Sequence, residues 1–215
     1  MKIEPTHFTH SLAFLCILFQ SCITTAQIVQ PVSTSEIMTD LLPYSTIPDY
    51  PESYTAATVT ARLIDGLGFR YHWASEALNE MDLAYRPNST ARSSMETMEH
   101  IYGLSVTILN GIKDLPNIRP YEEVNHSWEE MRAHTLGNFK SAADLMRTMP
   151  DQDLAELEIT FQRGDKKSSF PFWHQFNGPI ADAIWHVGQV VTFRRASGNP
   201  IDSRVNVFMG NVRER

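Results

Sequence analysis

Hydrophobic side chains recur every three or four residues in four long segments of the chain, and polar side chains occupy the positions between them. These segments span residues 54–80, 93–111, 127–149 and 177–197. Such spacing places the hydrophobic side chains on one face of an α-helix, and a face of this kind packs against a protein core. The pattern therefore predicts four long helices with short or medium links, which favours a helical bundle.

Polar residues indicate where two of these helices begin. Ser93 precedes Glu96 by three residues, and Ser127 precedes Glu130 by the same interval. This is the spacing of a capping box, in which each side chain accepts a hydrogen bond from the other residue's backbone N–H. We expect the second and third helices to begin at these serines.

The last segment carries the clearest helix signals. Asn177 can cap its N-terminus, and Gly198 follows its last turn. Four apolar residues fall one or two turns apart and are expected to form its core stripe: Ile180, Ile184, Val187 and Val191.

Residues 151–176 follow a different pattern. Apolar and polar side chains alternate over 157–161, residues 163–166 can turn, and 169–172 is again apolar. This predicts a short β-hairpin or irregular segment, which Pro171 confines to a sheet edge. The expected fold class is all-α: a four-helix bundle with a short irregular or β-hairpin insertion before the last long helix.

The first 26 residues have the pattern of a secretory signal peptide. Lys2 is followed by an apolar region over 11–20 and by small polar residues that end at Ala26. A buried N-terminal helix, a membrane anchor and a lipoprotein modified at Cys22 are the alternatives. We expect an exported protein, either periplasmic or secreted.

Signal cleavage would leave an N-terminal arm over 27–52 and a bundle domain over 53–215. The formal charge of −7 and the absence of Lys/Arg runs argue against nucleic-acid binding. No segment after the signal is apolar for the roughly 20 residues that a membrane span needs. Both cysteines, Cys16 and Cys22, lie in the signal, so the mature chain would hold no thiol. Catalysis would then depend on histidines, carboxylates, hydroxyls or a metal ion.

Asp182 and His186 are the strongest candidates for such chemistry. They lie four residues apart, so a helix projects them side by side, where they can share a cation or form an ordinary ion pair. A metal site needs at least one ligand from another helix. His100 in the second helix borders the buried stripe and can face the bundle interior; otherwise it is a core histidine with a hydrogen-bond partner.

The remaining polar candidates favour structural roles. His72 is expected in an aromatic cluster, with lining of the same cavity as the alternative. Gln189 can hydrogen-bond a ligand or a neighbouring helix. Arg194 and Arg195 complement the dipole at the helix end. Three other histidines are expected in caps, loops or on helix surfaces: His126, His134 and His174.

Two segments resemble the DinB-like (YfiT-like) metalloprotein family, and the resemblance covers about residues 55–200. Members typically carry a histidine on the second helix, where the segment Ser93–Ser105 places His100, and a His-x-x-x-His-x-Gly-Gln element on the fourth. The later histidine of that element matches His186, whereas Asp182 stands where the earlier one usually is. The resemblance implies an up-down-down-up four-helix bundle, often a homodimer, with a bound metal ion.

The carboxylate at position 182 can be interpreted in two ways. His100, Asp182 and His186 would form a set of two histidines and one carboxylate, which binds Fe, Zn, Ni or Mn and leaves positions open for water or substrate. Alternatively, Asp182 only orients a histidine, and the metal site is weakened or absent.

The expected function is that of an exported metal-binding protein; if it is an enzyme, it is expected to be a metal-dependent hydrolase or transferase that acts on an unknown small molecule. Members of the resembling family include thiol-dependent transferases and isomerases as well as hydrolases. Because the thiol cofactors are cytosolic and this chain is expected outside the cytosol, an enzyme of this kind is expected to carry out metal-assisted hydrolysis or lyase chemistry with a bound water. The competing hypothesis is a non-enzymatic interaction or metal-binding protein of the cell envelope.

Overall fold

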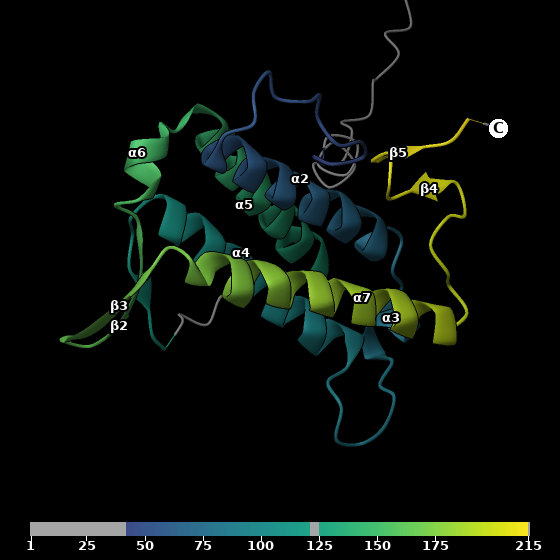
Figure 1. The fold of residues 1–215 in the computed structure, drawn as a ribbon. Helices are drawn as coiled ribbons and strands as arrows, with labels where there is room; N and C mark the ends of the chain where they lie inside the picture. The colour runs from purple at the N-terminus through teal and green to yellow at the C-terminus, as the bar shows by residue number, and fades with distance from the viewer. Residues whose placement is uncertain (1–41, 121–124, 215) are drawn as a thin grey trace, which may run out of the picture. The chain divides into compact units, whose positions relative to one another are not determined.

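The computed structural model describes residues 42–120 and 125–214, which belong to one compact unit within Ser33–Arg215 (Figure 1). The expected signal peptide and the first part of the expected N-terminal arm lie outside the described residues. Within the described ranges, no helix has both the length and the apolar character that a membrane crossing requires.

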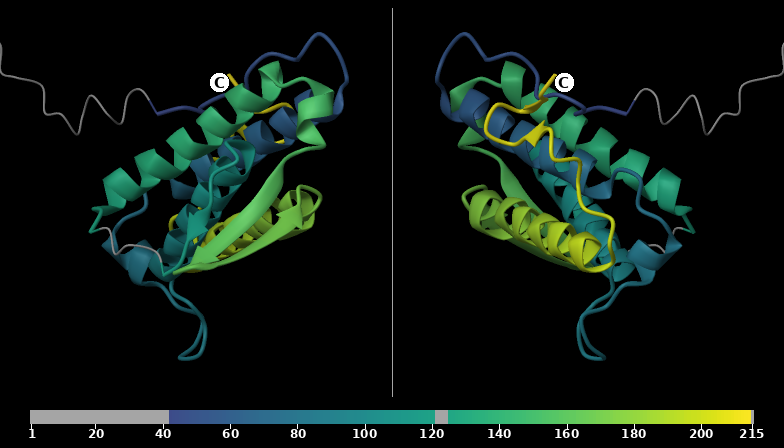
Figure 2. Two further views of the ribbon diagram at one scale, coloured as in Figure 1. Left: turned by 90° about the vertical axis from the view of Figure 1, so that its left-hand side faces the viewer. Right: turned by 90° about the vertical axis from the view of Figure 1, so that its right-hand side faces the viewer.

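Four long helices form the framework of this unit. They are α2 (Ala56–Ser75), α4 (Ser94–Ile112), α5 (Trp128–Thr148) and α7 (Ala181–Ala196). Helix α2 contacts α5 and α7, and α4 contacts the same two helices from the other side (Figures 1 and 2). The predicted capping boxes of Ser93 with Glu96 and Ser127 with Glu130 are both present, so local sequence defines where α4 and α5 begin.

The prediction of an all-α four-helix bundle is wrong, because the chain also forms two sheets. Strands β2 (Glu158–Arg163) and β3 (Lys166–Pro171) pair antiparallel, and β1 (Asn117–Ile118) pairs parallel to β2. A second sheet joins β4 (Val205–Asn206) to β5 (Asn211–Val212). Strands β1, β4 and β5 have only two residues each, too few to show the alternating pattern from which a strand is predicted.

Two short helices and one irregular turn complete the described elements. They are α3 (Glu80–Ala84), α6 (Asp151–Leu154) and the π-helical turn η1 (Phe176–Ile180). The first predicted helix, 54–80, is therefore too long: Glu76 is extended, Ala77 has a φ of 53°, and Asn79 caps α3 through a separate capping box with Asp82.

The last helix also begins later than predicted. Asn177 lies inside η1 instead of capping a helix, and Gly178 is non-helical at a kink. Pro179 follows with no backbone N–H to donate, so regular α-helical bonding begins only with α7. Its end is as expected, with Gly198 at a φ of +95°.

The core lies between the four long helices. Its largest fully buried side chains include Ile64, Met98, Leu136 and Phe139. On α7 the predicted stripe is only partly right, because Ile184 and Val191 are half-buried. The buried face of α7 instead follows Ala183, Val187, Val190 and Arg194.

Arg194 is a cation that packs inside this core. Its guanidinium donates to the backbone carbonyls of Trp73 and Ala74 near the end of α2, at 2.9 and 3.0 Å, and Nε donates to the carbonyl of Asn199. The prediction that Arg194 only complements the dipole of its own helix is therefore incomplete. Its hydrogen bonds also join the C-terminal ends of α2 and α7.

The described end of the N-terminal arm packs tightly on α2. The Tyr44 side chain is buried, and its hydroxyl donates to Asp65 at 3.1 Å. Its ring lies so close to Gly68 that a Cβ atom there would come within 2.4 Å of it. Glycine at position 68 is therefore required for this close approach. The sequence alone did not indicate that a residue of the N-terminal arm makes it.

Candidate metal centre

One group of side chains between α4 and α7 could hold a metal ion. His100 projects from α4, and Asp182 and His186 project from α7. Nε2 of His100 lies 3.1 Å from Asp182 Oδ2, and Nε2 of His186 lies 3.2 Å from Asp182 Oδ1. The structure thus brings together the three residues that the sequence singled out.

Local structure sets these positions. The capping box at Ser93 fixes the start of α4, and Ile101, next to His100, is fully buried in the core. On α7, Asp182 and His186 lie one turn apart, while Ala183 and Val187 anchor the adjoining face in the core. The packing of α4 against α7 then closes the group.

Gln189 determines which nitrogen of His186 carries a proton. Its Oε1 lies 2.7 Å from His186 Nδ1, and because an amide oxygen can only accept, Nδ1 is the donor. Nε2 of neutral His186 then carries a lone pair and faces an Asp182 oxygen, which also carries lone pairs. In this tautomer, Nε2 of His186 and Oδ1 of Asp182, which lie 3.2 Å apart, can both coordinate one cation.

The donor set fits a transition metal. All three ligand atoms lie within 4.8 Å of one another. In a tetrahedral site with bonds of about 2.1 Å, neighbouring ligand atoms lie about 3.4 Å apart, close to the two measured separations. The side chains of His100, Asp182 and His186 are 32%, 38% and 14% exposed, so solvent or a small molecule can reach the group.

Electrostatics favour the metal-binding form of His100. Partial burial lowers the pKa of its imidazole, the hydrogen bond to Asp182 opposes this shift, and the positive charge of Arg92 adds to the lowering. A lowered pKa keeps the ring neutral, and only the neutral ring has a lone pair for a metal ion.

Two cavities meet at His100. The polar cavity, of about 450 Å³, is lined by charged side chains that include Arg86, Arg92 and Glu96. The large cavity, of about 780 Å³, has a mostly apolar wall that includes Leu104, Val106, Ile118 and Met131. Glu99 and His100 line both, so the candidate centre lies beside space for a small molecule.

The other histidines in the described part of the chain lie outside this group. His72 contacts the Trp73 ring and has Nδ1 2.8 Å from the Pro43 carbonyl oxygen, in agreement with the expected aromatic cluster. The rings of His126 and His134 contact each other, and His174 contacts Phe170. His126 also lines the large cavity, which its sequence position did not indicate.

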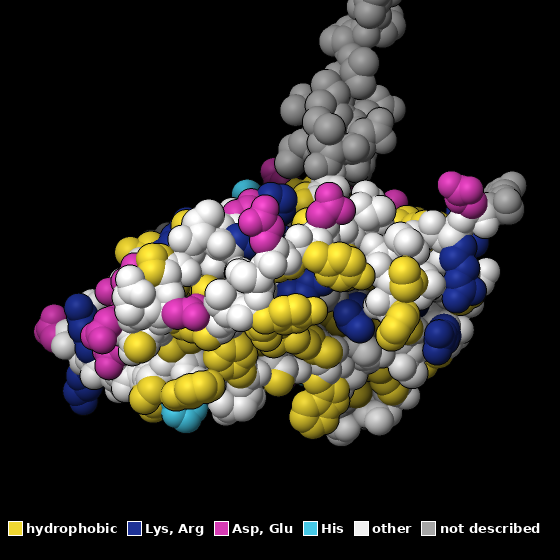
Figure 3. Space-filling view, turned by 45° about the horizontal axis from the view of Figure 1, so that its top comes forward, with side chains coloured by type: hydrophobic (Ala, Val, Ile, Leu, Met, Phe, Trp, Pro, Cys, Tyr) yellow, Lys and Arg dark blue, Asp and Glu magenta, His cyan; other side chains and the backbone are white. Residues whose placement is uncertain are grey.

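A separate apolar hollow lies along α2 and α7. Figure 3 shows hydrophobic side chains gathered on this face. The hollow measures about 610 Å³ and is lined by Tyr54, Val59, Leu63, Ile184 and Phe208, among others. None of the three candidate ligands lines it, so it does not belong to the candidate centre.

Comparisons of the chain with models of protein families, with curated proteins and with solved structures find no match. The chemistry of this centre therefore has to be inferred from its own residues.

Proposed function

We propose that this protein is a metalloprotein in which His100, Asp182 and His186 hold one divalent transition-metal ion, Zn, Ni, Fe or Mn. The observation that carries this proposal is the contact of one carboxylate, that of Asp182, with the Nε2 atoms of two imidazoles. Gln189 sets the tautomer of one of these rings, that of His186. A second hydrogen bond that fixes a histidine in this way is typical of metal ligands.

Hydrolysis of a small molecule is the activity that this centre best supports. A bound ion would supply a Lewis acid that polarises an oxygen and activates water. Three protein ligands leave coordination positions open, and the exposed side of Asp182 faces solvent. The chain's own residues hold and orient the ion, while the two cavities give a substrate access to it.

The proposed assignment to the DinB-like family rests on the sequence resemblance. Asp182 replaces the family's earlier histidine, and a carboxylate oxygen is a competent ligand at the same helical position. The sequence further predicts export, and export favours water over a thiol as the reactant. The resemblance implies a homodimer.

Elemental analysis tests the metal site directly. Protein prepared without a histidine tag should contain about one transition-metal ion per chain, either as isolated or after reconstitution. Asp182→Ala and His186→Ala should each lose the ion, because two donors bind far more weakly than three. His174→Ala removes a histidine outside the group and should retain it. Retention of metal by both ligand variants, or no metal in the native protein, would contradict the proposal.

A further inference from the structure

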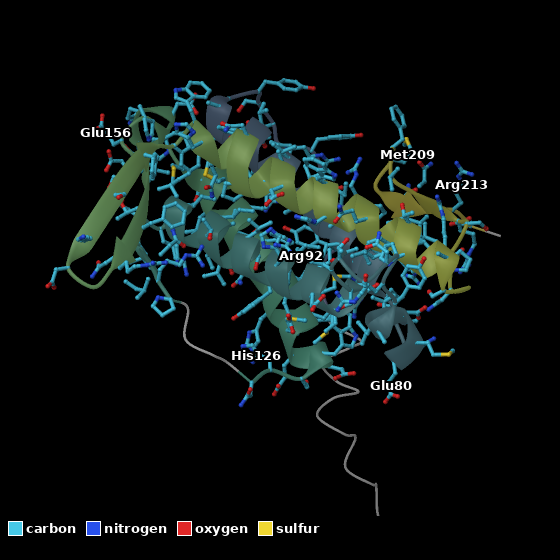
Figure 4. The ribbon with its side chains drawn as sticks, turned by 90° about the horizontal axis from the view of Figure 1, so that it is seen from below. Glu80, Arg92, His126, Glu156, Met209 and Arg213 are labelled. Atoms are coloured by element: carbon cyan, nitrogen blue, oxygen red, sulfur yellow. The ribbon has the colours of Figure 1, made fainter. Side chains whose placement is uncertain are left out.

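The loop between α3 and α4 places positive charge next to the candidate centre. This loop, residues 85–93, projects from the helices (Figure 2), and Arg86 and Arg92 from it line the polar cavity together with His100. Figure 4 views the molecule from the side on which the loop projects and labels Arg92 there.

The two arginines differ in how their charges are compensated. Arg86 forms an ion pair with Glu96 at 2.9 Å and also donates to the Ala91 carbonyl. Arg92 is exposed, and no ion pair or hydrogen bond involves its side chain within the described residues. Arg92 and His100 nevertheless line the same polar cavity.

The charges around the polar cavity favour an anion once the metal site is filled. Arg86 and Glu96 neutralise each other, and Arg92 balances Glu99, the remaining charged group of the lining. A divalent ion outweighs the single negative charge of Asp182. The net charge presented to a ligand is then positive.

The large cavity has a different character on the other side of His100. Met95, Leu104, Val106 and Met131 give it an apolar wall that can accommodate a hydrocarbon group. Its volume of about 780 Å³ is within the range of small-molecule sites.

We propose that the substrate of this centre is an organic acid with an apolar body, and that Arg92 binds its acid group. The acid group lies in the polar cavity, where a guanidinium can donate two parallel hydrogen bonds to it. The apolar body enters the large cavity past His100. This inference rests on the proposed metal site, and Arg92 is assigned as a binding residue that determines specificity.

Visible spectroscopy of the Co²⁺-loaded protein tests this inference, with octanoate as the probe. Octanoate should perturb the Co²⁺ bands at lower concentration than acetate, and octylamine of the same length should bind at least about 10-fold more weakly than octanoate. Arg92→Gln should weaken octanoate binding about 10-fold or more, because it removes a charged hydrogen-bond donor, while Co²⁺ stays bound. Arg92→Lys should restore part of the affinity.

Two further variants separate the acid site from the apolar site. Leu104→Gln should weaken octanoate binding and leave acetate binding unchanged, because only the longer probe reaches the large cavity. Arg213→Gln, which changes an arginine outside both cavities, should bind octanoate like the native protein.

The outcomes distinguish this inference from the proposed function. Equal affinities for octanoate and octylamine, or an Arg92→Gln variant that binds octanoate normally, overturn the substrate assignment while Co²⁺ binding stands. Failure of the native protein to bind Co²⁺ overturns the metal site and the substrate assignment with it.

Discussion

Two carboxylates lie at opposite ends of α7, and their surroundings differ. Asp82 projects from α3 to the C-terminal end of α7, where it is almost completely buried. It accepts hydrogen bonds from the Asn79 backbone N–H at 3.0 Å, from Asn199 Nδ2 at 2.6 Å and from the Ser197 hydroxyl. Asp182, near the N-terminal end, is 38% exposed and contacts two imidazoles.

The difference separates a structural carboxylate from one that is suited to bind a cation. Protein donors compensate the charge of Asp82, so it joins α3 to the residues that follow α7 and needs no ion. At Asp182, one of the two neighbouring nitrogens has a lone pair when its ring is neutral, and the site is open to solvent. Measurements on the two aspartates can therefore test whether their roles differ as their surroundings indicate.

The largest contrast is expected in stability. With a metal chelator present, Asp82→Ala should lower the free energy of unfolding by about 2–3 kcal/mol, because several buried donors lose their acceptor. Asp182→Ala should lower it by less than about 1 kcal/mol, since a partly exposed ion pair contributes little. Urea unfolding followed by tryptophan fluorescence measures both values. Equal losses in the two variants would remove the distinction.

A smaller effect is expected on metal affinity when the hydrogen bond between Gln189 and His186 is removed. Gln189→Leu should reduce metal affinity about 10- to 100-fold, because the Nδ1 proton of His186 loses its acceptor and the ring is no longer held in position. Gln189→Glu retains an acceptor oxygen and is the matched control. Competition titration with a chromophoric chelator measures the affinities. An unchanged affinity in the leucine variant would show that the ring is held by other contacts.

The smallest contrast concerns acid sensitivity. Burial raises the pKa of Asp82, but the hydrogen bonds from Asn199, Asn79 and Ser197 outweigh it and hold the pKa below its ordinary value. The stabilisation from these bonds is complete above the ordinary pKa of about 3.9 and is lost as the pH falls through the lowered pKa.

Asp82→Asn should accordingly flatten the loss of unfolding free energy below about pH 4, when stability is measured as a function of pH. The slope is compared, and not the absolute stability, because asparagine also changes the hydrogen bonds. Asp202→Asn alters an exposed aspartate that pairs with Arg204 and serves as the control. An unaltered slope in Asp82→Asn would mean that other carboxylates dominate the acid response.

Local sequence patterns predicted those parts of the fold that local interactions decide. The capping boxes at Ser93 and Ser127 each involve residues only three positions apart, and both are present. The pattern at Asn79 and Asp82 is of the same kind, but the hydrophobic spacing over 54–80 predicts one continuous helix across Asn79.

Other features depend on contacts between distant residues, and the sequence did not reveal them. Strand β1 exists because Asn117 and Ile118 pair with residues more than 40 positions later, and nothing in a two-residue strand marks it in advance. The core position of Arg194 likewise depends on carbonyl groups about 120 residues earlier in the chain.

The candidate centre likewise has a part that local sequence predicts and a part that depends on tertiary packing. Helical periodicity alone determined that Asp182 and His186 lie side by side, because residues four apart share a helix face. Only the packing of α4 against α7 decided that His100 reaches Asp182, and that the charge of Arg92 and two cavities adjoin it. Ligand binding by these residues stays a prediction. The physical reason is range: a hydrogen-bonded turn spans four residues, whereas this group joins side chains more than 80 positions apart.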